Sequence, residues 1–496
     1  MPRHRLVAWA ILAAIFPHQA MAGSAAPAPA PASSSPDLAR ERTLASAVSR
    51  ERALAAVRAL VESGPRMGGT ASGDRAAALI AGWMREARLA VEIVDDPPKQ
   101  VHEETWTLEL PTGRLPSAWP WGFSPSLARG AYGLITDDAL PNDPPAPGTP
   151  GSAAGRAVFT SKAPITVFRR AAAAGAVAVL TDYGTAPDKF VDAAPIVEVR
   201  GGTPLPVFAL SYADGRVLRA ALAANPGIRI TLALDSSIHE GRPRTVIGSI
   251  PGAGSRGDQV ILVCAHGDSD SGGPGADDNA SGEAALLEVA RVLSDAASAG
   301  SLPADRPTIR FAIWGSELHS SRAYIASRAA ELPRHVAVFN YDQAGTGAQR
   351  DAIYYEGNDV PWNAALLRTI EAVAHDHAGE PGFWTAYTSN PSLGGTDMYV
   401  FLPREFQGMG LIAERIPVTT VFSSAWDHPT IVKQTEGWQS PGWKETGPVF
   451  VDYSTVYHSS GDLPAKTTEA EPFNMERCAR LVVLAIARLL EGSGAP

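Results

Sequence analysis

Residues 260–282, VILVCAHGDSDSGGPGADDNASG, decide the fold that we predict for this chain. The stretch opens with six consecutive apolar residues, a pattern typical of a strand that is buried on both faces of a sheet. Polar residues follow at once, within a glycine-rich loop. They are His266, Asp268, Asp270, Asp277 and Asp278.

A helix is predicted directly after this acidic loop, because apolar residues recur at i, i+3, i+4 and i+7 from Leu286. A strand, a loop and a helix in this order form a βα unit. In open α/β sheets, ligands bind beyond the carboxyl ends of the strands. Imidazole and carboxylate groups at that position favour a divalent cation. These residue types therefore predict a zinc-dependent hydrolase.

The remaining strands and helices extend this unit in both directions. Further buried strands are predicted at residues 308–314, 336–341 and 418–423, with a last helix at residues 474–490. Two helices and two strands are predicted between residues 38 and 110, the second strand from the alternation of Trp106, Leu108 and Leu110. Alternating strands and helices predict an α/β fold with a mostly parallel central sheet and helices on both faces.

The middle of the chain has a different character. Residues 126–239 contain short β-type runs and alanine-rich helices, but few side chains that could do chemistry. We expect an inserted β-rich domain there, which caps the site or binds substrate. The catalytic domain then comprises residues 37–125 and 240–496.

The first residues read as an export signal. Basic residues precede eleven mostly aliphatic ones, residues 6–16, and a small-residue cleavage site follows at residues 20–22. The apolar run is too short to span a bilayer, which takes roughly 20 residues. We expect a signal peptide at residues 1–22, a disordered Ala/Pro linker at residues 23–36, and export to the periplasm or medium without a stable membrane span.

The net charge of the chain bears on its binding partners, and the positions of its cysteines bear on disulfide formation. The chain has 42 lysines and arginines against 52 aspartates and glutamates, a formal charge of −10. This balance offers no basic surface for nucleic acid or an anionic membrane, and we expect neither as a partner. Cys264 and Cys478 both lie in apolar segments, and we expect two buried thiols. The oligomeric state stays open.

Polar residues end three later segments as they end the first strand. Glu317 and His319 follow the strand at residues 308–314, Asp342 follows the strand at residues 336–341, and His458 lies in a later loop. Zinc takes histidine nitrogen and carboxylate oxygen as ligands, and two zinc ions need a bridging carboxylate.

The motifs H-x-D, G-A-D-D-N-A-S-G, W-G-x-E, N-x-D and Y-H-x-x-x-D occur in this order beside those strands. In this the chain resembles the co-catalytic zinc exopeptidases, which include secreted bacterial aminopeptidases and glutamate carboxypeptidase relatives. Several of these enzymes carry an inserted protease-associated domain, to which the run AAAAGAVAVLTD is similar. The resemblance implies a peptide or small amide as substrate.

The resemblance also implies a role for each polar residue. His266 and His458 would each bind one of two Zn²⁺ ions, Asp278 would bridge the ions, and Asp342 would be a terminal ligand. Asp268 would accept a hydrogen bond from the second ring nitrogen of His266 and fix its tautomer. The family has a cis peptide bond after the bridging aspartate, and the same is expected here.

One position departs from the family pattern. The family has two adjacent glutamates after the third strand, a general base and a metal ligand, but this chain has Glu317 followed by Leu318. Glu317 takes the position of the base. Two alternatives stay open: Glu317 is the ligand, or His319 supplies it. Leu318 could weaken one of the two metal sites.

Substrate contacts are expected from two further places. Asp397 and Tyr399 match a short acidic motif that lies near the substrate in the family, although Asp397 could equally cap a helix. Trp426, Trp438 and Trp443 could line an entrance.

The sequence thus predicts an exported zinc exopeptidase that hydrolyses terminal peptide bonds, an aminopeptidase rather than a carboxypeptidase, with Glu317 as general base. Two alternatives remain. One is a catalytically impaired homologue that only binds, which Leu318 favours. The other is an acyltransferase similar to glutaminyl cyclase, which uses one zinc ion.

Overall fold

The computed structural model describes residues 37–115, 118–142, 152–183, 205–269, 273–347, 352–357, 360–390, 396–404, 411–424, 451 and 453–492. The predicted signal peptide and linker lie outside these residues. Among the described helices, none is long and apolar enough to cross a lipid bilayer.

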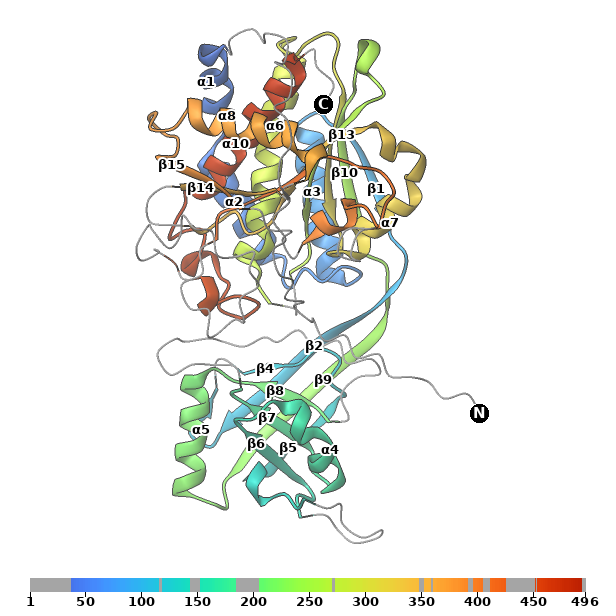
Figure 1. The fold of residues 1–496 in the computed structure, drawn as a ribbon. Coiled ribbons are helices and arrows are strands. Elements are labelled where there is room, and N and C mark those ends of the chain that lie inside the picture. The colour runs from blue at the N-terminus through green and yellow to red at the C-terminus, as the bar shows by residue number, and fades with distance from the viewer. Residues whose placement is uncertain are drawn as a thin grey trace, which may run out of the picture. The chain divides into compact units, whose positions relative to one another are not determined.

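The first of two sheets contains the predicted strand at residues 260–265. Over the described residues it has eight strands in the order β1-β10-β12-β11-β13-β16-β14-β15. Figure 1 labels β1, β10, β13, β14 and β15. Their bounds are β1 Ala90–Asp95, β10 Arg244–Ile250, β11 Val260–His266, β12 Thr308–Trp314, β13 His335–Tyr341, β14 Ala352–Glu356, β15 Ala386–Asn390 and β16 Val418–Phe422.

The centre of this sheet is parallel and its edges are mixed. Strands β12, β11, β13 and β16 run parallel to one another, whereas β1, β10 and β14 pair antiparallel with a neighbour. Because the central strands are parallel, their carboxyl ends lie at one edge of the sheet. The α/β class that we predicted, with a mostly parallel central sheet, is confirmed.

Helices and short turns cover both faces of the sheet, so β11 is buried along its whole length. Its alternate side chains enter two different cores: Ile261 and Val263 pack with α2, α3, α6, α8 and α10, whereas Leu262 packs with α7 and η7. The helix bounds are α1 Leu38–Ser46, α2 Arg50–Glu62, α3 Ala71–Glu86, α6 Gly282–Ser298, α7 His319–Ser327, α8 Ala364–Asp376 and α10 Asn474–Glu491, with the short turn η7 at Asp397–Phe401.

The second sheet has its own core. Over the described residues its order is β3-β2-β9-β5-β6-β7-β8-β4, with helices α4 (Pro164–Ala173) and α5 (Tyr212–Ala224). The strand bounds are β2 Lys99–Leu110, β3 Gly113–Arg114, β4 Trp119–Pro120, β5 Leu127–Thr136, β6 Arg156–Thr160, β7 Ala178–Thr181, β8 Val207–Ala209 and β9 Arg229–Gly241.

The chain enters this second sheet through β2 and leaves it through β9. The two strands are antiparallel partners, with Lys99 opposite Gly241 and Glu109 opposite Thr231. β2 thus belongs to the second sheet although it precedes the insertion that we predicted at residues 126–239. An alternating pattern shows that a strand is half exposed, but it does not show which sheet the strand joins.

Both cysteines are buried free thiols, as predicted. Cys264 lies in β11 and Cys478 in α10.

Candidate metal centre

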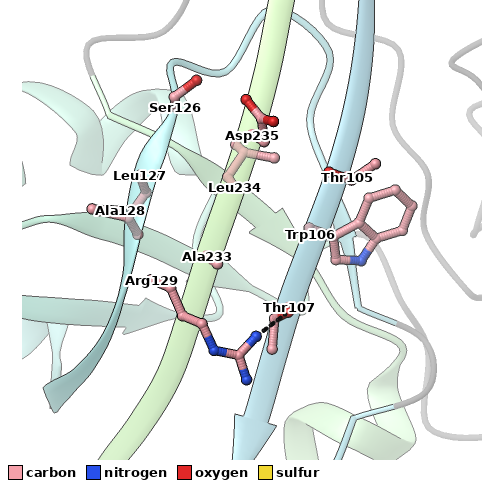
Figure 2. A pocket seen from close by; sticks show the side chains of 10 residues that line it. All are labelled: Thr105, Trp106, Thr107, Ser126, Leu127, Ala128, Arg129, Ala233, Leu234 and Asp235. Carbon is pink, nitrogen blue, oxygen red and sulfur yellow. Dashed lines mark hydrogen bonds between the residues drawn. The ribbon is translucent and has the colours of Figure 1, made fainter.

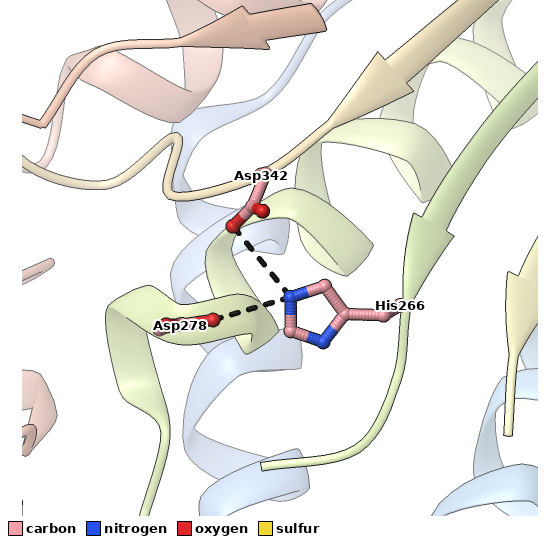
Figure 3. A group of neighbouring side chains, drawn as sticks. All are labelled: His266, Asp278 and Asp342. Carbon is pink, nitrogen blue, oxygen red and sulfur yellow. Dashed lines mark ion pairs between the residues drawn. The ribbon is translucent and has the colours of Figure 1, made fainter. Parts of the chain in front are cut away.

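Three buried side chains meet at the carboxyl end of the central strands. His266 ends β11, Asp342 directly follows β13, and Asp278 lies in the short helical turn η4 (Ala276–Ser281) that precedes α6. One potential ligand atom from each lies within 4.8 Å of those from the other two. Nε2 of His266 is 3.2 Å from Oδ1 of Asp278 and 3.6 Å from Oδ1 of Asp342 (Figure 3).

His458 approaches the same group from the far side of Asp278. Its Nε2 atom lies 3.1 Å from Oδ2 of Asp278, while Oδ1 of Asp278 faces His266. The His458 ring stacks on Tyr457, with ring centroids 3.5 Å apart. Asp278 therefore presents one carboxylate oxygen to each histidine, which is the arrangement that a carboxylate bridging two cations requires.

The donor set fits a divalent metal ion. Oδ1 of Asp342 is buried, faces His266, and has no hydrogen-bond donor among the described residues. Although burial lowers the pKa of His266, the neighbouring carboxylates of Asp268, Asp278 and Asp342 raise that pKa well above its ordinary value. A buried site that attracts positive charge so strongly, with nitrogen and carboxylate ligands, suits zinc.

Asp268 connects His266 to the loop after β12. Its Oδ1 atom lies 3.4 Å from Nδ1 of His266 and accepts a 2.8 Å hydrogen bond from the backbone N–H of Glu317. The same Nδ1 atom lies 3.1 Å from the backbone oxygen of Asp268. Nδ1 thus faces oxygen acceptors and Nε2 faces the cluster, which is the orientation predicted for a metal-binding histidine.

Asp397 holds the residue after Glu317. Its Oδ1 atom accepts a 2.8 Å hydrogen bond from the backbone N–H of Leu318 and another from the hydroxyl of Ser321. Leu318 has a φ of +54° and packs against the apolar core beside η7. Burial raises the pKa of Asp397 to about 6. In the structure Asp397 thus supports the Glu317 loop, and Tyr399, which is half buried, packs against the same core.

The structure does not group His319 with the three buried side chains. Its Nε2 atom lies 2.8 Å from the carbonyl oxygen of Pro97, on an exposed side of the loop. A carbonyl oxygen can only accept, so Nε2 of His319 carries the hydrogen and is not a ligand atom.

Asp462 is the last residue of the motif Y-H-x-x-x-D, and the sequence analysis gave it no role. Its two carboxylate oxygens accept hydrogen bonds from the backbone N–H groups of Asp277 (2.9 Å) and Asp278 (3.0 Å). The hydroxyl of Tyr453 donates to it as well (3.0 Å). Burial and the nearby Asp277 raise its pKa to about 7. Asp462 therefore ties the His458 loop to the turn that carries Asp278.

Asp277, the residue before Asp278, is fully buried. Its Oδ1 atom accepts the backbone N–H of Gly345 (2.7 Å), and its Oδ2 atom accepts the hydroxyls of Thr346 (2.8 Å) and Ser424 (2.7 Å). It thus supports the neighbouring Asp278 and does not face solvent. The peptide bond after Asp278 is cis, as the family resemblance implies.

Arg66 stabilises the glycine-rich loop from behind. This buried arginine donates to the backbone oxygens of Gly267 (3.2 Å), Pro274 (2.8 Å) and Gly275 (2.8 Å). Its guanidinium also lies 3.4 Å from the buried carboxylate of Glu283. Gly275 has a φ of +58°, and a side chain there would come within 2.5 Å of the backbone of Asp278. Nothing in the sequence marked Arg66, because its partners are backbone oxygens.

Several predicted residues cannot be placed. Asp270, Trp426, Trp438 and Trp443 lie outside the described residues.

A separate cavity of 640 Å³ lies on the second sheet, where β2, β9 and β5 meet (Figure 2). Trp106 and Arg129 are among its lining residues, which include none of the metal cluster.

A family model supports the resemblance that the motifs suggested. It matches residues 245–484, the part of the chain that contains β11, the metal cluster and α10, and its description is peptidase family M28. The match covers 240 of the 496 residues of the chain.

Proteins with sequences similar to this chain carry the name aminopeptidase. The chain is 28% identical over 298 residues to leucine aminopeptidase 2 of Trichophyton rubrum, an alignment that covers 58% of this chain and 53% of that protein. It is 28% identical over 306 residues to aminopeptidase YwaD of Bacillus subtilis, covering 59% and 61%. The aligned part of the chain thus spans about half the length of the fungal relatives that it matches.

Solved structures share the fold over most of the chain. The zinc aminopeptidase BSAP from Bacillus subtilis superposes with a TM-score of 0.58 at 22% identity, covering 89% of this chain and 95% of BSAP. A peptidase M28 precursor from Shewanella amazonensis gives a TM-score of 0.60 at 20% identity, covering 92% and 97%. At these identities the likeness concerns the fold alone.

Proposed function

We propose that the protein is a zinc-dependent exopeptidase of the M28 family that hydrolyses terminal peptide bonds, and that it acts as an aminopeptidase. The position of Asp278 between the two histidines, beside the buried Asp342 oxygen, carries this proposal. The names of the sequence relatives favour amino-terminal over carboxy-terminal cleavage.

In this proposal His266, Asp278, Asp342 and His458 hold the metal. When bound, zinc polarises the scissile carbonyl and lowers the pKa of a water molecule. Glu317 takes a proton from the attacking water and returns it to the leaving amine. Asp268 keeps Nε2 of His266 directed at the cation and, through the N–H of Glu317, fixes the loop that carries the base.

The two metal positions have unequal ligand sets among the described residues. His266, Asp278 and Asp342 form one complete group of three, whereas His458 shares only Asp278. Leu318 stands where the family has a glutamate ligand, and it packs against an apolar core. We propose two zinc sites, of which the one at His458 is weaker.

The two alternative functions predict different outcomes. A homologue that only binds would retain zinc without turnover. A cyclase of the glutaminyl type would use one zinc ion and release pyroglutamate. The intact contacts of Asp268 with His266 and Glu317 favour a working hydrolase.

The proposal also covers the export of the protein and the domain inserted into its catalytic domain. We propose that residues 1–22 direct export to the periplasm or medium and are removed, and that residues 23–36 are a linker. The second sheet is, in this proposal, an inserted domain of the protease-associated type that extends from Lys99 to Gly241, which adds β2, β3 and β4 to the predicted residues 126–239.

Metal removal tests the proposed function. Purified protein is assayed with leucine p-nitroanilide, with blocked acetyl-leucine p-nitroanilide and with carboxy-terminal peptide substrates. Chelation should abolish hydrolysis and zinc should restore it, for the free amino terminus only. Activity that survives complete metal removal would overturn the proposal. Pyroglutamate formation from glutaminyl peptides, without hydrolysis, would favour the cyclase.

A further inference from the structure

The chain segment that leads from β1 into β2 runs along the loop that carries Glu317. The carbonyl oxygen of Pro97 accepts a hydrogen bond from His319, and Nζ of Lys99 donates to Oγ of Ser316 at 2.9 Å. Ser316 directly precedes Glu317. The first residue of the second sheet therefore places an ammonium group beside the proposed general base.

No carboxylate among the described residues forms an ion pair with Lys99. It is half buried, and its hydrogen-bond partner among the described residues is the neutral hydroxyl of Ser316. An ammonium group has three donors, so this contact leaves hydrogen-bonding capacity for a ligand. Lys162, by contrast, lies 2.6 Å from Asp137 and 3.2 Å from Asp138.

A second cationic side chain lies at the junction where Lys99 begins β2. Arg242, which follows the β9 residue opposite Lys99, also has no carboxylate partner among the described residues, and it donates to the backbone oxygen of Asp96. Lys99 and Arg242 thus add two cationic groups at this junction, although the chain as a whole is acidic.

The reaction defines which part of a substrate lies on this side. Glu317 returns its proton to the leaving amine, so the residue that leaves lies next to Glu317. In a dipeptide, the terminal carboxylate is attached to the same α-carbon as that amine. An acidic side chain on the leaving residue also starts from this carbon.

We propose that Lys99 binds a carboxylate on the leaving residue, and that the enzyme therefore prefers dipeptides or peptides with an acidic second residue. This inference rests on the proposed peptidase function. Charged hydrogen bonds outside full solvent exposure confer roughly ten-fold selectivity.

The test compares substrates of similar shape that differ in charge. Leucyl-glycine carries a terminal carboxylate, leucyl-glycinamide carries none, and leucyl-aspartic diamide and leucyl-aspartic α-amide differ only in the side-chain carboxylate. We expect kcat/KM to be about ten-fold higher for at least one charged substrate than for its neutral counterpart, through a lower KM. The pair that shows the preference identifies the source of the carboxylate.

Variants then assign the preference to one side chain. Lys99→Met should reduce the charged-to-neutral ratio of kcat/KM to about one, Lys99→Arg should retain most of it, and Lys162→Met should leave it at the wild-type value. Equal kcat/KM within both pairs in the wild type, or an unchanged ratio in Lys99→Met, would overturn the inference while leaving peptidase function intact. If zinc-loaded protein hydrolyses neither these peptides nor leucine p-nitroanilide, the proposed function fails and the inference fails with it.

Discussion

Asp278 shows how single residues could and could not be predicted. It was identified as a bridging ligand because it follows a strand end and matches a family motif, and its two oxygens do face two histidines. Asp462 lies in a predicted motif but received no role, because its task is to accept backbone N–H groups. Residues that act through the backbone leave no spacing pattern in a sequence. Arg66 was missed for the same reason.

The two roles considered for Glu317 can be separated by one substitution. Glu317→Gln should lower kcat by about 10²–10⁴-fold, because glutamine cannot accept the proton of the attacking water. Zinc content should stay at the wild-type value. Steady-state kinetics on leucine p-nitroanilide and metal analysis by mass spectrometry measure the two effects.

A loss of zinc in Glu317→Gln would contradict the role of base and assign Glu317 as a ligand. Glu331→Gln is a matched control, since Glu331 pairs with Arg310 (2.9 Å) on another part of the surface. It should change neither kcat nor zinc content.

Asp462→Asn should weaken zinc binding by roughly 10–100-fold, the usual effect of removing a group that orients a ligand. An amide offers one oxygen, whereas Asp462 accepts two backbone N–H groups and the hydroxyl of Tyr453. Competition with a chromogenic chelator measures zinc affinity. Asp305→Asn is the control, because Asp305 accepts similar hydrogen bonds from Ser255 and Arg256 at an exposed turn. Equal affinities in the two variants would show that Asp462 does not position Asp278.

At the level of elements, the sequence predicted the positions of strands and helices along the chain, but it did not predict which strands pair with each other. The apolar runs at β11, β12, β13 and β16 gave the strand positions within about two residues, because burial on both faces needs continuous apolar sequence. The alternating strand β2 was also found, but its pairing with β9 was not. That pairing joins residues far apart in the chain, and register depends on a partner that a local pattern does not contain.

The loop between β11 and α6 should depend on Arg66 for its stability. Arg66→Met removes three hydrogen bonds to backbone oxygens and leaves Glu283 buried without its cation. Burial already raises the pKa of Glu283 to about 8 beside Arg66. Because a carboxyl with this pKa is mostly protonated at neutral pH, the cost comes from the three backbone oxygens that lose their donor, and we expect a loss of about 3–5 kcal/mol in the free energy of unfolding.

Urea denaturation of the metal-free protein measures this loss. Arg58→Met serves as the control, because Arg58 is an exposed arginine whose partner Glu469 is also partly exposed, and such pairs contribute about 0–1 kcal/mol. If both variants unfold at the same urea concentration, Arg66 does not stabilise the loop.

For the whole molecule, the N-terminal helix α1 is joined to α8 and α10 through buried charges. His377 is fully buried, with Nε2 2.8 Å from Glu41 of α1 and Nδ1 3.1 Å from Glu380. Glu41 also accepts two hydrogen bonds from Arg488 of α10, at 2.7 and 2.8 Å. Burial lowers the pKa of His377, but hydrogen bonds to Glu41 and Glu380 outweigh it and raise that pKa.

This network should make stability fall at alkaline pH. Because the pKa of His377 is higher in the folded than in the unfolded chain, its contribution is complete below the unfolded value of about 6.5 and is lost as pH rises through the folded value. Urea unfolding of the wild type and of His377→Gln, compared from pH 6 to pH 9, measures this effect. The difference between the two should shrink as pH rises.

His375→Gln is the matched control. His375 is exposed and lies 3.2 Å from Asp376, so its removal should leave the pH dependence of the wild type unchanged. A constant difference between wild type and His377→Gln across this range would contradict a role for the charge of His377.

The pairing of Lys99 with Gly241 brings the two junctions of the second sheet next to each other. Because the two ends of this segment are neighbours, recombination can exchange the segment, here called the cassette, as one unit. If the cassette is deleted, a tight turn can join the two chain ends that remain. Lineages of this scaffold could therefore gain, lose or swap the cassette without rebuilding the metal cluster. Each such event would also replace the lysine at its first position, so substrate choice and architecture would change in the same evolutionary step.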